Sequence, residues 1–146
     1  MGLLADFFVA TPDQALHYAN QADEPDDGEE IHALLQPVEY KGFTSLELGT
    51  LWAILADVPW NAKTHMVEDT FYGEEGESWL NRFPDELTSL LAAASPDLLA
   101  KVCATWAATE ELACDPQHIS PVLADLQVLA KRAISESKSV HLWGCL

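Results

Sequence analysis

Carboxylates and aromatic side chains gather in two segments of the sequence, and this combination is typical of a surface that binds a cationic protein. The first segment is the acidic run 23–30, and the second is the run 68–77, which Trp60, Phe71, Tyr72 and Trp79 flank or interrupt. Aromatic anchors inside a polar rim supply much of the energy of protein interfaces, and an acidic field speeds encounter with a basic partner. The residues predicted to contact such a partner are Asp26, Asp27, Glu29, Glu30, Tyr72, Glu74, Glu75, Glu77 and Trp79. The alternative interpretation is that these aromatics belong to the hydrophobic core.

The acidic run 23–30 also resembles part of a calcium-binding EF-hand loop. Asp23, Asp27 and Gly28 match positions 1, 5 and 6 of that loop, but Leu34 stands at position 12. Position 12 must supply a bidentate glutamate. The pattern therefore favours a solvated acidic loop over a calcium site.

Two further groups of residues could hold a metal ion or exchange protons. One is a Cys2His2 set whose spacing is unlike that of usual zinc ligands, and it comprises Cys114, His118, His141 and Cys145. The other is the partial cluster His65, Glu68 and Asp69, and adjacent pairs such as Glu68-Asp69 and Glu110-Glu111 could do acid–base work. These groups keep a small metal-assisted or acid–base enzyme as an alternative. The sequence contains no P-loop, G-x-S-x-G or G-x-G-x-x-G motif, so we assign no catalytic residue and predict no cofactor or metal.

The charge of the chain excludes several classes of partner. Its 146 residues carry 24 Asp and Glu against 7 Lys and Arg, a formal net charge of −17. Nucleic acid and anionic membranes both require clustered basic residues, so neither is predicted as a partner. The length and the 49% hydrophobic content predict a single globular domain over 1–146 with a sizeable core. Five tryptophans also allow a self-associating structural domain as an alternative.

Addressing signals are not evident in the sequence. Residues 1–10 carry no Lys or Arg and include Asp6, which makes them a poor secretory signal. The three cysteines are an odd number, which fits reduced thiols better than a disulfide framework. We therefore expect a cytoplasmic location.

Helix starts are marked by Ser, Thr or Asp followed by Pro, an N-cap with proline at the first helical position. These pairs are Thr11-Pro12, Ser95-Pro96, Asp115-Pro116 and Ser120-Pro121. With apolar residues at helical spacing behind the starts, the sequence predicts five helices, at 12–21, 45–56, 84–94, 96–113 and 121–136. Short apolar runs predict strands at Leu3 to Val9, Val38 to Phe43 and Val140 to Leu142. The expected fold is α+β and predominantly helical, with terminal strands that could pair with each other.

Three short segments resemble the YfbM-like family of small uncharacterised bacterial cytoplasmic proteins. They are Met1-Gly2-Leu3-Leu4, the helix Leu48-Gly49-Thr50-Leu51-Trp52-Ala53-Ile54-Leu55, and the Trp79-Leu80 step before a leucine-rich helix. The resemblance implies one α+β domain and no assigned reaction. The residues themselves favour a non-enzymatic acidic binding protein for a basic protein partner, in the manner of an immunity protein or inhibitor.

Overall fold

The computed structural model describes residues 3–21, 28–67, 69–73 and 76–146 and has a helix-rich α+β fold. Over these residues one antiparallel sheet has the strand order β2-β1-β5-β4-β3. Its strands are β1 (Leu4–Ala10), β2 (Val38–Lys41), β3 (Asp69–Tyr72), β4 (Ser78–Arg82) and β5 (Ser139–Cys145). The helices are α1 (Pro12–Gln21), α2 (Gly28–Leu35), α3 (Ser45–Ala56), α4 (Asp85–Ala93), α5 (Pro96–Ala107) and α6 (Pro116–Glu136).

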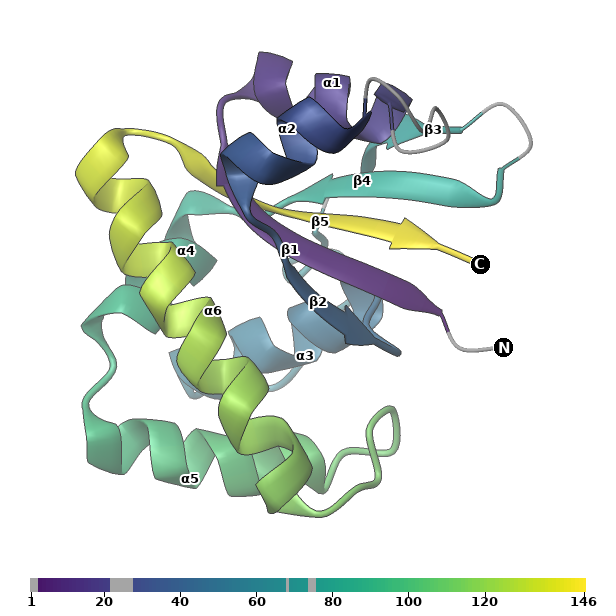
Figure 1. Cartoon of the computed structure of the whole chain (residues 1–146). Helices are drawn as coiled ribbons and strands as arrows, with labels where there is room; N and C mark the ends of the chain where they lie inside the picture. Colours follow the sequence, from purple (N-terminus) through teal and green to yellow (C-terminus); the bar gives the residue numbers. More distant parts are fainter. Residues whose placement is uncertain (1–2, 22–27, 68, 74–75) are drawn as a thin grey trace.

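The two ends of the chain meet in the middle of the sheet. β1 and β5 pair along their whole length, from Leu4 opposite Cys145 to Ala10 opposite Ser139. The sequence predicted the two terminal strands and left their pairing open, and the structure shows that they pair with each other. Helices α1 and α2 cover one face of the sheet, and α3 to α6 lie on the other (Figure 1).

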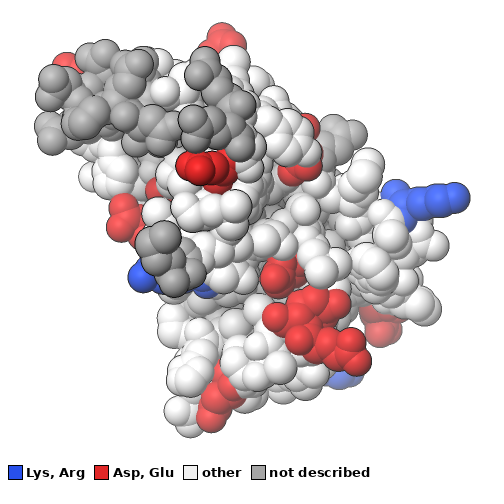
Figure 2. All heavy atoms as spheres, turned by 90° about the vertical axis from the view of Figure 1, so that its right-hand side faces the viewer, with Lys and Arg blue, Asp and Glu red and all other residues white. Residues whose placement is uncertain are grey.

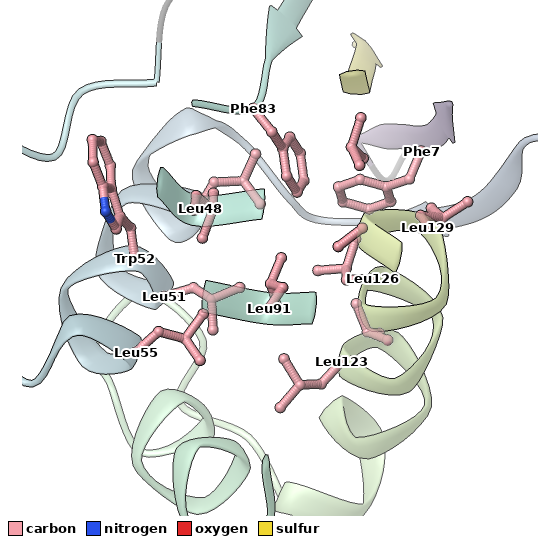
Figure 3. Close-up of a cluster of buried hydrophobic side chains, with 14 of the residues drawn as sticks. Phe7, Leu48, Leu51, Trp52, Leu55, Phe83, Leu91, Leu123, Leu126 and Leu129 are labelled. Carbon is pink, nitrogen blue, oxygen red and sulfur yellow. The ribbon is translucent and has the colours of Figure 1, made fainter. Parts of the chain in front are cut away.

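Alternate residues of β1 enter two separate hydrophobic cores. Phe7 and Val9 join the larger core, which α3 to α6 fill mainly with leucines (Figure 3). Phe8 and Ala10 join the smaller core beneath α1 and α2. Because successive side chains of a strand point to opposite faces, burial on both faces explains the almost unbroken apolar run of β1.

The predicted helix caps at three of the four Ser, Thr or Asp positions are confirmed. Thr11 forms a reciprocal capping box with Gln14, since each backbone N–H donates to the other side chain. The Ser95 hydroxyl accepts from the N–H of Leu98, and Asp115 caps α6 through the N–H of Gln117.

The prediction of a helix start at Pro121 is wrong. Helix α6 begins at Pro116 and passes through Pro121, because Ile119 is buried and continues the apolar stripe of the helix. The predicted helix 96–113 is also too long, and α5 ends at Ala107.

Strand placement differs from the prediction in the middle of the chain. The acidic runs 23–30 and 68–77, in which the sequence predicted neither helix nor strand, contain the start of α2 and all of β3, and β4 follows at 78–82. In α2, Ile31 and Leu35 are spaced i, i+4 and fill the smaller core. Acidic residues outnumber apolar ones in this segment, so its composition did not predict a helix. The helix is stabilised by the burial of its apolar side chains against the sheet.

Candidate functional site

The β3–β4 hairpin brings together the two predicted aromatic anchors. Tyr72 lies directly opposite Trp79, and Trp79 lies opposite Gly144 of β5. Opposite residues share one face of a sheet, so these three positions form a cross-strand row. A Cβ at Gly144 would lie 2.4 Å from Cε2 of Trp79. The missing side chain of Gly144 therefore provides the space in which the half-buried Trp79 indole packs.

Asp69 orients the exposed ring of Tyr72. The Tyr72 hydroxyl donates a hydrogen bond to Oδ2 of Asp69, while the side-chain amide of Asn81 donates to Oδ1. Although Tyr72 is 63% exposed, this hydrogen bond restrains its ring, and it raises the pKa of the phenol because it favours the protonated form. In the sequence Asp69 was considered as a possible metal ligand and as part of an acid–base pair with Glu68, whereas its positioning role depends on the hairpin register.

The structure describes part of the predicted acidic surface. The side chains of Glu30 and Glu77 are exposed, and the Glu77 carbonyl accepts a 2.9 Å hydrogen bond from the N–H of Leu146. The molecular face that includes the chain ends shows many more acidic than basic side chains (Figure 2). Glu29 belongs to α2, but its side chain is not described. Four predicted contact residues lie outside the described residues, namely Asp26, Asp27, Glu74 and Glu75.

The other two aromatics of the acidic region have different environments. Phe71 is partly buried against the smaller core, as the core interpretation predicts. Trp60, in the loop after α3, is 47% exposed, and its Nε1 is 3.4 Å from the position of a Cβ on Gly49 of α3. Trp60 therefore packs against α3, whereas Tyr72 and Trp79 lie opposite each other in the β3–β4 hairpin.

A polar cluster lies on the face of the sheet that α1 and α2 cover. The sequence did not predict this cluster. The Tyr18 hydroxyl donates a 2.6 Å hydrogen bond to Asp6, and Nε2 of His32 donates to Glu39 at 2.9 Å. Asp6 and Glu39 face each other across β1 and β2. Burial raises the pKa of Asp6, although its hydrogen bond from Tyr18 opposes this shift. Asp6 inside an apolar run was the one signal of this cluster in the sequence.

The predicted cluster around His65 serves the fold. His65 is buried, its Nδ1 accepts a 3.0 Å hydrogen bond from the N–H of Asn61, and its ring contacts Trp52 edge to face. Asp69 is engaged with Tyr72 and Asn81, and Glu68 lies outside the described residues. Within the described ranges, no three His, Cys, Asp or Glu side chains are close enough to share a metal ion.

The Cys2His2 set is not assembled either. His141 and Cys145 stand four residues apart on β5, a separation of roughly 13 Å at the rise of a strand. This distance is too great for two ligands of one zinc ion. The EF-hand interpretation fails as well, because residues 28–34 of its loop are helical.

Comparisons with protein-family models, curated proteins and solved structures find no match for this chain. The resemblance to the YfbM-like family stays a prediction. Across the part of the chain that the structure describes, no helix combines the length and apolar character needed to cross a bilayer.

Proposed function

We propose that the protein is a non-enzymatic binding protein that presents the β3–β4 hairpin to a basic protein partner. The observation that carries the proposal is the row formed by Tyr72 and Trp79, in which one ring is exposed but restrained and the other is half-buried against Gly144. Restrained aromatic side chains lose little conformational entropy on binding, and Tyr and Trp are the residues most often found as interface hot spots.

Charge supports a basic partner over a neutral one. The carboxylates of Asp69 and Glu77 are exposed on the hairpin, and the whole chain carries a formal charge of −17. Such a field accelerates association with a cationic protein and makes the association rate depend on ionic strength. An immunity protein or inhibitor acting on a cationic toxin or nuclease is the most specific form of this proposal.

The test is an affinity capture from host lysate at low and moderate salt, followed by association kinetics with the purified partner. We expect the wild type to recover a basic protein whose association rate falls as salt rises. Neutralising the hairpin acids with Glu74→Gln, Glu75→Gln and Glu77→Gln should slow association and flatten its salt dependence, and Tyr72→Ser should mainly speed dissociation. Val128→Ser, at an exposed position of α6, is the control. A partner whose association rate ignores salt and these substitutions would refute the proposal.

A further inference from the structure

Helices α3 and α5 border a groove that the hairpin proposal does not use. Two hollows of about 430 and 310 Å³ adjoin, and they share Ala53, Ile54 and Val58 in their walls. The first continues toward Leu98 and Lys101 of α5, and the second toward Trp60 and Glu110. The shared walls make the two hollows one continuous groove with an apolar floor.

The end of α3 sets the position of Val58 in this groove. Asp57 adopts a left-handed conformation with φ of 57°, its N–H donates to the Ile54 carbonyl, and the N–H of Val58 donates to the Ala53 carbonyl. These bonds form a Schellman cap, in which the residue after the left-handed position packs back on the last turn. The cap therefore holds Val58 at the groove wall while leaving it 47% exposed.

Two further contacts fix the walls before any partner binds. A Cβ on Gly49 would lie 2.5 Å from the His65 carbonyl oxygen, so this glycine lets the loop that carries Trp60 approach α3. On the other side, Nε1 of the buried Trp106 donates a 3.0 Å hydrogen bond to the Glu47 carbonyl and joins α5 to α3. A preformed groove needs little reorganisation on binding.

Most of α3 is buried, but the groove walls beside it carry exposed apolar side chains. Eight of the twelve residues of α3 are buried, as expected of a helix that is hydrophobic on nearly all sides, and Ile54 is partly buried against the larger core. Val58, Trp60 and Leu98 in the groove walls are 47%, 47% and 38% exposed. Neighbouring apolar side chains left exposed in this way are typical of an interaction surface.

Charges at the rim indicate what the groove can accept. Glu110 and Glu111 are exposed at the Trp60 end, whereas Asp57 and Lys101 line the other end. The acidic end attracts cations, and an apolar floor between two helices suits the apolar face of a third helix. A second copy of this chain is disfavoured, because two molecules each carrying −17 repel one another.

We propose that the groove between α3 and α5 binds an amphipathic helix of a partner protein, with the basic side chains of that helix at the Glu110–Glu111 end. The apolar positions of the helix, at i, i+3, i+4 and i+7, contact Ile54, Val58 and Trp60. None of the residues of this groove belongs to the β3–β4 hairpin. The groove proposal can therefore be supported or refuted independently of the function proposed above.

The probe is a synthetic amphipathic helical peptide built from leucine and lysine, compared with a peptide of the same composition in scrambled order. Binding is measured by calorimetry, and the site is mapped by amide chemical-shift changes. We expect the ordered peptide to bind and the scrambled one to bind at least about tenfold more weakly, since only the first presents an apolar face. Shift changes should centre on α3 and α5.

Variants locate the site on the protein. Trp60→Ala should weaken binding about tenfold or more, as expected for a central aromatic anchor. Val58→Asn should also weaken binding. It keeps the Trp60 indole, so it tests the groove without disturbing a loop whose structure depends on that indole. Val128→Asn is the matched control, because Val128 is an exposed valine of α6. Glu110→Lys with Glu111→Lys should reduce both affinity and its salt dependence.

The outcomes separate this inference from the proposed function. Equal binding of the ordered and scrambled peptides, or equal effects of Val58→Asn and Val128→Asn, would overturn the groove as the site. Loss of peptide binding in Tyr72→Ser but not in Trp60→Ala would overturn the groove and favour the hairpin. Loss in Trp60→Ala and Val58→Asn, with Tyr72→Ser unaffected, is the result expected.

Discussion

Acid should weaken the fold through His141, and His141→Phe should remove most of this sensitivity. His141 is only 2% exposed in the smaller-core face of β5, where it stacks on Phe8 with ring centroids 5.7 Å apart. Its Nε2 donates to the Ala10 carbonyl at 3.3 Å, and the ring also hydrogen-bonds with the backbone of Asn81. Burial, with a smaller contribution from the nearby positive charge of Arg82, lowers the pKa of His141 to about 4.

The size and sign of the effect follow from this pKa. An unfolded histidine titrates near 6.5, so below that pH the unfolded chain takes up a proton that the folded protein does not. The stability due to neutral His141 is therefore complete above pH 6.5 and is lost as the pH falls toward about 4. Between pH 7 and pH 5 the free energy of unfolding should fall by about 2 kcal/mol from this residue alone.

Urea unfolding followed by circular dichroism at pH 7, 6 and 5 measures this fall, and stopping at pH 5 stays above the sequence pI of about 4.3. Asp6 has the opposite effect on the pH dependence of stability, because its raised pKa makes the folded protein retain a proton as the pH falls. This contribution of Asp6 is the same in the wild type and in His141→Phe. The difference between the two proteins thus isolates His141. His118→Phe, at an exposed position, controls for loss of an imidazole. An equal loss of stability in wild type and His141→Phe would refute the reasoning.

Three further substitutions test local features of the fold by urea unfolding. Gly144→Ala should cost about 1–3 kcal/mol, because the new Cβ would overlap the Trp79 ring; unchanged stability and tryptophan fluorescence would contradict the packing described. Ser137→Gly should add roughly 0.5–1 kcal/mol, because Ser137 ends α6 at a φ of 56° that glycine adopts without strain, and a loss of stability would argue against this cap. Thr44→Ala should cost about 1 kcal/mol by removing the capping box with Glu47, and no change in stability would mean that the box is not needed.

Local chemistry predicted the helix boundaries well where a cap is present. Thr11 and Ser95 stand before prolines whose missing N–H costs nothing at a first helical position, and both helices begin as predicted. The same rule failed at Ser120-Pro121, because an earlier cap at Asp115 had already started the helix and the buried stripe continued through the proline.

The candidate site was predicted only in part. Tyr72 and Trp79 were chosen for their residue types, but their alignment needs the register of β3 and β4. The packing of Trp79 also needs Gly144 of β5, which lies opposite it and more than sixty residues later in the chain. The groove depends on Val58 and Ile54, whose apolar side chains look like ordinary core residues in the sequence. Nothing in sequence spacing distinguishes an apolar residue that is covered from one that is left at the surface.

The sequence by itself determined the charge of this protein, its helix-rich α+β class and the capped helix starts, because these depend on composition and on contacts within a few residues. The tertiary structure decided which acidic segments became helix or strand, where His65 and His141 are buried, and that Val58 and Trp60 after α3 stay exposed. Those outcomes depend on contacts between residues far apart in the chain. Gly144 illustrates the difference: its position is plain in the sequence, but its role exists only because β5 lies beside Trp79.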